Sequence, residues 1–365
     1  EFGGNGLALP NLEALGLANA GELASGVRAP LVSGLAKMTL AGRCKYGCME
    51  EISAGKDTIS GHWEMAGVPV RQDFGHFPLE YPSFPAEMVA RICERAGIPG
   101  ILGNKAASGT VIIQELGEEH LASGKPIFYT SADSNLQIAA HQEHFGLERL
   151  YELCQIAYRY VQPYNIGRII ARPFIGEKAG SFTRTKFRRD YTAQPFGDTL
   201  LDRLKAAGRE VFAIGAINDI YAHRGITEEI HGAGLEELWN LTLGALQTAP
   251  DNSLIFTNFE DFDMLWGHRR NVKGYAEGLE YFDSRLPEIL PHIRDDDLLF
   301  ITADHGNDPT YEGTDHTREQ VPVLMFGRQV APRSLGRRAT YADLGQSIAA
   351  FLDIAPLAYG ESFLK

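Results

Sequence analysis

The sequence predicts an α/β fold, and three observations support this prediction. Short apolar runs rich in β-branched residues alternate with longer segments of helical periodicity, as expected for strands and helices packed in layers. Polar and hydroxyl residues follow several of these runs directly, and the carboxyl ends of strands are where α/β folds carry their chemistry. A hydrophobic fraction of 44% with 39 glycines among 365 residues fits an α/β protein with many loops.

The expected elements follow the chain in order. Each predicted strand is a run of four to six mainly apolar residues: 126–130, 168–171, Val211–Ile214, Leu254–Thr257, 297–301 and Val321–Phe326. The run 297–301 is continuously apolar after its first residue, which predicts a buried parallel strand. Helices are expected over 147–160 and 274–293. A further helix should place Leu344, Ile348, Phe351 and Leu352 on one apolar face, because they recur at i, i+4, i+7 and i+8.

Two clusters of acidic and imidazole side chains follow predicted strands. The segment 302–308 carries Asp304 and His305, and His316 follows shortly after it. The segment 261–270 comes after the strand Leu254–Thr257 and adds two aspartates and His268. Two of these carboxylates, together with the three imidazoles, can hold two divalent ions at the strand ends. Mixed oxygen and nitrogen ligands suit Mn, Zn or Fe better than Ca, which prefers oxygen alone.

A third cluster lies early in the chain, in the segment GKDTISGHWE (55–64). Thr58 and Ser60 stand between glycines and precede a stretch compatible with a helix. They could provide a nucleophile or a phosphate site at a helix N-terminus, where free N–H groups and the helix dipole favour an anion. The alternative is that Thr or Ser simply caps the helix. The two metal clusters favour the nucleophile, because metal ions activate hydroxyl groups.

Composition restricts the class of protein. A chain of this length can bury a large core and is expected to form two domains. The net charge of −13 argues against a nucleic-acid surface. No apolar stretch approaches the ~18 residues that span a bilayer, and neither a signal peptide nor an obligate protein partner is indicated. The four cysteines do not complete a metal site, which favours reduced thiols in a cytoplasmic protein.

Several long motifs carry a resemblance to a known family. They are GKDTISGHWE (55–64), GNKAASGT (103–110), YTSADSNLQIAAH (129–141), IARPFIGE (170–177), DFDMLWGHRR (261–270), TADHGNDP (302–309) and GTDHTREQVPVL (313–324). Over nearly its whole length the chain resembles the phosphopentomutases, a family of the alkaline phosphatase superfamily. The resemblance implies an alkaline phosphatase-like core, with a central, mostly parallel sheet flanked by helices, formed by residues 1–76 and 192–365. It also implies an inserted α/β cap domain over 77–191 that binds the sugar and its phosphate.

The resemblance assigns roles in the core by position. Thr58 matches the threonine that is phosphorylated in the active enzyme and bridges two Mn²⁺ ions. The implied reaction interconverts ribose 1-phosphate and ribose 5-phosphate, or the deoxyribose pair, through a sugar bisphosphate that also serves as activator. Two sets of metal ligands are implied, Asp263, His268 and His316 for one ion, and Asp304 and His305 for the other.

Within the implied cap domain, four residues are expected to bind the substrate. Asp133 resembles a carboxylate that contacts the sugar, and Ser131 lies in the same motif. Arg172 and Arg188 resemble guanidinium groups that hold the distal phosphate, and arginine binds phosphate through two parallel hydrogen bonds.

The sequence departs from the family pattern in two respects. The family opens with a strand that ends in an aspartate of the second metal site. No equivalent stands in this sequence, whose start is also shortened near Gly4 and Asn5. Either residues of the natural protein are missing from it, or the protein has lost a ligand and a central strand, and we expect the former. Ala216 stands where the family has a lysine that contacts phosphate, and Asn135 stands where an apolar residue is usual.

Three functions therefore compete. The first is a mutase for pentose phosphates. The second is a divergent phosphatase or mutase of the same superfamily for another sugar phosphate, with Ala216 and Asn135 marking the altered pocket. The third is an inactive binding protein with an incomplete metal site.

Overall fold

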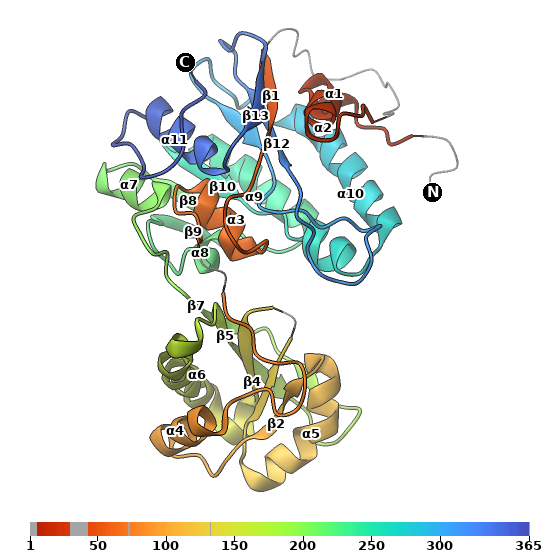
Figure 1. Cartoon of the computed structure of the whole chain (residues 1–365), viewed down its shortest axis with the longest axis vertical. Coiled ribbons are helices and arrows are strands. Elements are labelled where there is room, and N and C mark those ends of the chain that lie inside the picture. Colours follow the sequence, from red (N-terminus) through yellow and green to blue (C-terminus); the bar gives the residue numbers. More distant parts are fainter. Residues whose placement is uncertain (1–5, 30–42, 72–73, 132, 365) are drawn as a thin grey trace. The chain divides into compact units, whose positions relative to one another are not determined.

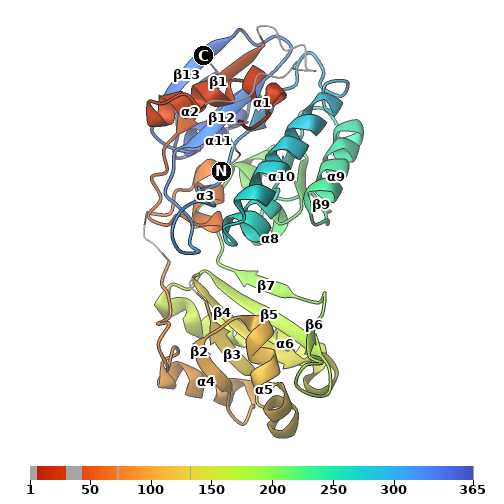
Figure 2. The ribbon, with the colours of Figure 1, turned by 90° about the vertical axis from the view of Figure 1, so that its right-hand side faces the viewer.

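The computed structural model describes residues 6–29, 43–71, 74–131 and 133–364. The start near Gly4 and Asn5 lies outside these residues. The chain divides into two compact units, shown in Figure 1 and Figure 2. Unit 1 comprises Glu1–Asp73 and Pro195–Lys365, and unit 2 comprises Phe74–Gln194. Unit 2 is therefore an insertion in the sequence of unit 1.

Unit 1 is built from short strands and helices that alternate along the chain. Its first part holds α1 (Pro10–Ala14), α2 (Leu17–Ser25), β1 (Cys44–Met49) and α3 (Thr58–Met65). After the insertion come α7 (Leu200–Ala206), β8 (Val211–Ile214), α8 (Ile217–Ile220), β9 (Glu228–Ile230), α9 (Leu235–Thr248), β10 (Leu254–Thr257), the π-helix η3 (Phe262–Gly267) and α10 (Val272–Arg285). The last part holds the 3₁₀ turn η4 (Leu286–Glu288), β11 (Leu299–Ile301), β12 (Val321–Phe326), β13 (Arg333–Arg338) and α11 (Ala342–Phe351).

The strands of unit 1 form two sheets. One has the order β11-β12-β1-β13, and the other is parallel with the order β10-β8-β9. Helices cover both faces of the first sheet, as the alternation along β12 shows (Figure 1). Its Leu324 and Phe326 pack with residues of α1, α9 and α10, whereas Val321, Val323 and Met325 pack with residues of α3 and α11. Successive side chains of a strand point to opposite faces, so β12 joins two cores.

The predicted strands are all present, but the pairing expected for 297–301 is wrong. β11 pairs antiparallel with β12, with Phe300 opposite Met325, and all three of its residues are only partly buried. The reason is its position, since within the described residues β11 is the outer strand of its sheet and has a partner on one side only.

Two helix predictions also need correction. The helix expected over 274–293 ends at Arg285, because Pro287 has no N–H to continue an α-helix and the chain turns into η4. In α11, Leu344 and Leu352 are buried as predicted, but Phe351 is 39% exposed. Its place at the last helical residue directs it away from the core.

Unit 2 is a sheet with helices on both faces. Its strands are β2 (Leu102–Ala106), β3 (Ile127–Thr130), β4 (Asn135–His141), β5 (Arg168–Ile175), β6 (Thr183–Arg184) and β7 (Arg189–Thr192). The order is β2-β3-β4-β5-β6, and β7 also pairs with β5. The helical segments are α4 (Ala86–Ala96), α5 (Gly109–Ser123), η1 (Gln142–Gly146), α6 (Leu147–Val161) and η2 (Gln162–Tyr164). One core lies under α4 and α6, and a second lies under α5.

None of the helices in the described parts of the chain combines the length and the apolar character that a bilayer-crossing helix needs.

Candidate metal centre

A π-helical turn brings Asp263 and His268 together. The backbone N–H of His268 donates to the Asp263 carbonyl oxygen at 3.0 Å, a bond from residue i+5 to residue i. Residues five apart in an α-helix point about 140° away from each other, whereas the wider π turn brings them toward the same side. Asp263 and His268 therefore converge because the chain forms a π-helical turn here, a local structure that is rare in proteins.

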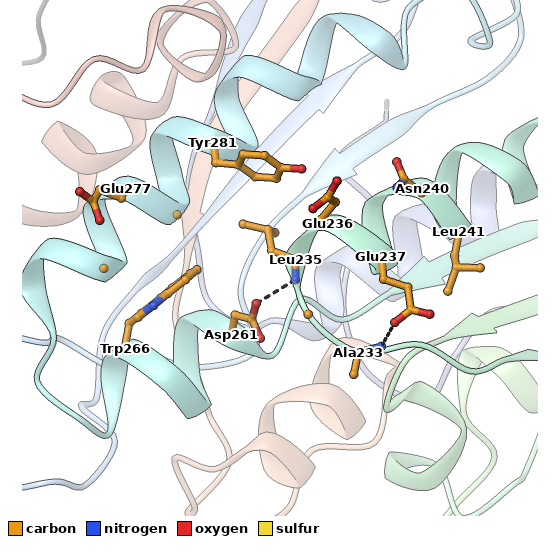
Figure 3. Close-up of a pocket in the computed structure, with 13 residues that line it drawn as sticks. Ala233, Leu235, Glu236, Glu237, Asn240, Leu241, Asp261, Trp266, Glu277 and Tyr281 are labelled. Carbon is orange, nitrogen blue, oxygen red and sulfur yellow. Dashed lines mark hydrogen bonds between the residues drawn. The ribbon is translucent and has the colours of Figure 1, made fainter.

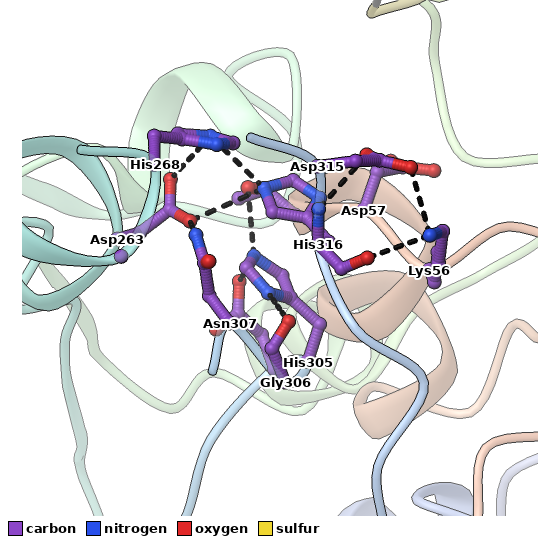
Figure 4. A network of polar contacts seen from close by, with 12 residues as sticks. Lys56, Asp57, Asp263, His268, His305, Gly306, Asn307, Asp315 and His316 are labelled. Carbon is purple, nitrogen blue, oxygen red and sulfur yellow. Dashed lines mark hydrogen bonds and ion pairs between the residues drawn. The ribbon is translucent and has the colours of Figure 1, made fainter. Parts of the chain in front are cut away.

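Asp263, His268 and His316 form a compact group of side chains suited to bind a metal ion (Figure 4). The Asp263 carboxylate lies 3.3 Å from His268 Nε2 and 3.2 Å from His316 Nε2, and the two nitrogens are 3.2 Å apart. Ligands held at ~2.1 Å by one tetrahedral ion stand ~3.4 Å from each other. The three side chains therefore have the spacing of ligands that share one cation.

The tautomer of His268 supports the same assignment. Its Nδ1 lies 2.7 Å from the Thr314 carbonyl oxygen, which can only accept, so Nδ1 carries the proton. Nε2 is then the nitrogen that faces the Asp263 carboxylate. Burial acts to raise the pKa of Asp263, but hydrogen bonds with His268 and His316 hold that pKa below its usual range. A cation would take the place of the proton between Nε2 and the carboxylate and would bind both groups.

A second group of donors consists of Asp304, His305 and Thr58. His305 Nε2 lies 3.4 Å from Asp304 Oδ2 and 3.4 Å from Thr58 Oγ1. His305 Nδ1 faces the Gly306 carbonyl oxygen at 3.2 Å, so Nδ1 donates there and Nε2 is the nitrogen that faces Asp304 and Thr58. The ring of His305 lies 4.0 Å from that of His316, measured between centroids. The two groups are therefore neighbours.

His62 orients Asp304, a role that sequence reasoning missed. Its buried Nδ1 lies 3.1 Å from Asp304 Oδ2 and 2.8 Å from the Thr58 carbonyl oxygen. Both partners accept, so Nδ1 donates, and Nε2 accepts from Asn258 Nδ2 at 3.1 Å. Burial acts to raise the pKa of Asp304, but the nearby His305 and His62 lower it to about 2. The signal in the sequence was the i, i+4 spacing of Thr58 and His62, which places both on one helix face.

Asp57, and not Thr58 or Ser60, caps helix α3. Its Oδ1 accepts from the backbone N–H groups of Ile59 at 3.0 Å and Ser60 at 3.2 Å. The Ser60 hydroxyl donates to Asp57 Oδ2 at 2.8 Å. The capping role predicted as the alternative for Thr or Ser is therefore wrong. Thr58 Oγ1 is left to face His305, at the end of the helix where the dipole favours negative charge.

Helix α3 lies in direct contact with the backbone of a predicted ligand. A Cβ atom added at Gly61 would stand 1.8 Å from the carbonyl oxygen of Asp304, far inside van der Waals contact. The neighbour is backbone and cannot rotate away as a side chain could. Gly61 therefore permits the approach that brings Thr58 and Asp304 into one site.

We expect Gly61→Ala to destabilise the protein by about 1–3 kcal/mol, because overpacking forces the backbone to shift. Gly244→Ala in helix α9 is the matched control, since nothing lies within 4 Å of its added methyl group. That control should be neutral or stabilising by about 0.5–1 kcal/mol, because alanine is the better helix former. Urea unfolding measures both, and equal stability of the two variants would contradict the close packing.

Arg270 and Asn307 are further residues whose roles the sequence did not indicate. The Arg270 guanidinium donates to two carbonyl oxygens of the 313–316 loop, each at 2.6 Å, and to Asn307 Oδ1 at 2.7 Å. Asn307 Nδ2 donates to Asp263 Oδ1 at 2.5 Å (Figure 4). Arg270 adopts φ +50°, an uncommon conformation for a residue with a side chain. The pair connects the loop of His316 to the π-helix of Asp263.

Asp261 belongs to the same sequence cluster but serves another purpose. It is buried, and its Oδ2 accepts from the backbone N–H of Leu235, at the start of α9, at 2.8 Å. It borders a cavity of about 850 Å³ that Trp266 and Tyr281 also line (Figure 3). Asp261 therefore fixes the start of a helix.

The four residues expected to bind substrate lie in unit 2. Arg172 is on β5, and Arg188 precedes β7 and forms two bonds of 2.7 Å to Asp190. Burial, and then the neighbouring Arg188, lower the pKa of Arg172 to about 10, so the Arg172 guanidinium is still charged at neutral pH. Ser131 and Asp133 lie between β3 and β4 and are partly exposed. The structure thus brings two cations into electrostatic range of each other.

Comparisons with known proteins extend over the whole chain. The Metalloenzyme superfamily matches residues 28–356. A phosphopentomutase of Elusimicrobium minutum is 59% identical over 363 residues, which cover 99% of this chain and 90% of that protein. The corresponding values for a phosphopentomutase of Aeromonas salmonicida are 55%, 99% and 89%. Among solved structures, a Pyrococcus horikoshii protein aligns with 95% of this chain and 94% of its own, at 14% identity and a TM-score of 0.47.

These similarities identify the protein class. The superfamily match agrees with the donor group of Asp263, His268 and His316 and indicates use of a divalent metal. Relatives at this identity over nearly the full length show an isomerase of the mutase type, which replaces the alternative of an inactive binding protein. The chain belongs to the phosphopentomutase family of the Metalloenzyme superfamily.

Proposed function

We propose that this protein interconverts ribose 1-phosphate and ribose 5-phosphate, and likewise the 2-deoxyribose pair. The names of its relatives suggest the substrate class. The observation that supports the mechanism best is the position of Thr58. Its hydroxyl stands at the N-terminus of α3, 3.4 Å from His305 Nε2, and the ring of His305 lies 4.0 Å from that of His316 in the other group of metal-binding side chains.

We infer two divalent cations, with manganese the metal that the family resemblance implies. The five ligand side chains described above would hold them, three for one cation and two, together with Thr58 Oγ1, for the other. Their mixture of carboxylate and imidazole suits manganese, zinc or iron. When bound, the cations would stabilise an ionised threonine oxygen and neutralise the oxygens of a transferring phosphoryl group.

Phosphorylated Thr58 is the donor in the proposed reaction. The P–O bond to Thr58 Oγ1 breaks while one forms to the free hydroxyl of the pentose monophosphate, and the proton of that hydroxyl ends on Thr58. The bisphosphate then returns its other phosphoryl group to Thr58, which leaves the isomeric monophosphate. The N-terminus of α3 favours the charge on the phosphothreonine. A sugar bisphosphate would activate unphosphorylated enzyme by the same transfer.

We propose that unit 2 is the cap domain that binds the substrate. Arg172 and Arg188 would hold the distal phosphate, since guanidinium groups pair with phosphate through two parallel bonds. Asp133 and Ser131 would contact the sugar. The pairing of Arg188 with Asp190 holds its guanidinium in a fixed orientation before substrate arrives.

The sheets of unit 1 bear on the second cation. Among the described residues β10 and β11 are outer strands, and Ile255, Phe256 and Phe300 on them are only partly buried, whereas Ala213 and Met325 on the adjacent strands are buried. Backbone groups that are unpaired at a sheet edge, and apolar side chains that are only partly buried, are stabilised when a further strand pairs with that edge. We propose that such a strand carries the aspartate that the family resemblance expects for the second metal ion.

We also propose a cytoplasmic location. All four cysteines, at positions 44, 48, 93 and 154, are free. Free thiols are the rule in a reducing compartment.

Ala216 supports the second candidate function, action on another sugar phosphate. It stands between β8 and α8, is partly exposed, and offers a methyl group where the family has a lysine. A charged hydrogen bond to phosphate contributes about 1.5–3 kcal/mol. Its absence should lower the affinity for the family substrate and leave room for a different one.

The test measures conversion of ribose 5-phosphate to ribose 1-phosphate by wild type and by Ala216→Lys, with Mn²⁺ and with or without a sugar bisphosphate. We expect isomerisation that depends on the bisphosphate, and a ten- to hundredfold higher kcat/KM for Ala216→Lys, mainly through KM. Release of inorganic phosphate without isomerisation would identify a phosphatase. Turnover of another sugar phosphate, with Ala216→Lys no better on ribose 5-phosphate, would favour the second candidate.

A further inference from the structure

We propose that Asn135 sets the specificity of the sugar site by fixing the hydroxyl of Ser131 as a hydrogen-bond donor. This inference rests on the proposed function, in which Ser131 and Asp133 contact the pentose. Asn135 is only 1% exposed and therefore acts through Ser131 and does not touch the substrate itself.

A chain of hydrogen bonds connects a cation on β5 to Ser131. Arg172 Nε donates to Gln137 Oε1 at 3.0 Å, and Gln137 Nε2 donates to Asn135 Oδ1 at 3.4 Å. Asn135 Nδ2 then donates to Ser131 Oγ at 2.7 Å. Asn135 and Gln137 are two apart on β4, so their side chains share one face of the sheet. Both amides are buried, which keeps water from competing for these bonds.

Arg172, at the charged end of this series of hydrogen bonds, sets the direction of all of them. A guanidinium group has donors only, so Gln137 must present its carbonyl oxygen to Arg172. The amide nitrogen of Gln137 then faces Asn135, and Asn135 must accept this hydrogen bond with Oδ1. Asn135 is left with Nδ2 for Ser131 Oγ. Neither amide can be turned over without placing two donors or two acceptors against each other, which costs free energy in a buried site.

The consequence falls on the Ser131 hydroxyl. Its oxygen accepts from Asn135, and within the described residues it donates to no acceptor of the protein, so its proton is available to an external oxygen. Asp133, two residues away and partly exposed, offers carboxylate oxygens that accept hydrogen bonds. A sugar hydroxyl accepts and donates at once. The pair of a fixed donor and a carboxylate therefore matches one ring hydroxyl of the pentose.

An apolar residue at position 135 would leave Ser131 free to rotate and either donate or accept. Asn135→Leu imitates this state with a side chain of similar size. Asn135→Asp keeps the shape of the side chain but reverses the hydrogen bond to Ser131, since a carboxylate can only accept. The Ser131 hydroxyl would then donate to position 135 and not to the substrate. Loss of one neutral hydrogen bond to the substrate corresponds to about a three- to tenfold change.

The experiment compares steady-state kinetics with ribose, 2-deoxyribose and 3-deoxyribose 5-phosphates for wild type, Asn135→Leu, Asn135→Asp, Ser131→Ala and Ser131→Ala/Asn135→Leu. We expect Asn135→Leu to raise KM three- to tenfold, with kcat little changed, but only for those sugars that carry the hydroxyl recognised by Ser131. The deoxy sugar whose KM does not change lacks the hydroxyl that Ser131 recognises, and so identifies it. Asn135→Asp should lose more, and Asn135→Leu should have no further effect once Ser131 is alanine.

The outcomes separate this proposal from the proposed function. No turnover of any pentose phosphate by the wild type would overturn the proposed function and, with it, this inference. With an active wild type, an equal loss on all three sugars, or full additivity of the Ser131 and Asn135 substitutions, would overturn the role of Asn135 alone. Thermal unfolding of each variant identifies a fold defect, which alone would not alter the ratio between sugars.

Discussion

Thr58→Ala is expected to abolish mutase turnover, by a factor on the order of 10⁴ or more, because the reaction loses the atom that carries the phosphoryl group. Folding should be little affected. Asp57 provides the cap of α3, and among the described residues the contact that Thr58 Oγ1 makes is a long one, at 3.4 Å from His305 Nε2. The ligand side chains remain, so metal content should change far less than activity.

Intact-mass measurement after treatment with a sugar bisphosphate provides the direct readout. Wild type should gain one phosphate and Thr58→Ala none. Ser60→Ala removes the other hydroxyl of the same helical turn, which donates to Asp57 and not to the metal-binding groups, and should still be phosphorylated. Substantial turnover by Thr58→Ala, or a phosphate on another residue, would refute Thr58 as the carrier.

His268→Ala should remove one cation and nearly all activity. His268 supplies one of three donor atoms that lie 3.2–3.3 Å apart around Asp263, so its loss leaves an incomplete ligand set. Changing residues that only support ligands costs 10- to 100-fold in metal affinity or activity, so removing a ligand should cost on the order of 100-fold or more. His231→Ala is the control, since His231 is exposed and pairs with Glu229, which belongs to neither metal-binding group.

Elemental analysis of protein purified without chelators gives the number of metal ions per chain. We expect wild type and His231→Ala to agree and His268→Ala to contain less metal, with activity restored in part by excess Mn²⁺. Full metal occupancy in His268→Ala would remove His268 from the ligand set. Absence of divalent metal from the wild type would contradict the centre as a whole.

Local signals in the sequence sufficed for much of the fold. Runs such as Val211–Ile214 and Val321–Phe326 are strands with the predicted bounds, because strand propensity and apolar pattern act over a few residues. The predictions were wrong where the structure depends on contacts with other elements of the fold. The apolar run before Asp304 forms β11, whose direction depends on β12, and Phe351 fits the helical period but lies where the helix leaves the core.

Prediction of the candidate site shows the same division. Asp263, His268 and His316 were found because acidic and imidazole residues of metal-binding type stand after strands, and their convergence is an outcome of the fold. Asp261 has the same chemistry and lies two residues from Asp263, yet it binds the start of α9. Residue type identifies candidates, and only packing separates a ligand from a helix cap.

By itself the sequence determined the α/β class, six of the strands, the motif that places Thr58 at the start of a helix, and the membership of its family. The tertiary structure alone decided that Nε2 of His268 faces the Asp263 carboxylate, that His62 holds Asp304, and that Asn135 points its amide at Ser131. The physical reason is that these properties belong to pairs of atoms from distant segments. A hydrogen bond has a direction only when both of its partners are in place, and no pattern within one segment contains the second partner.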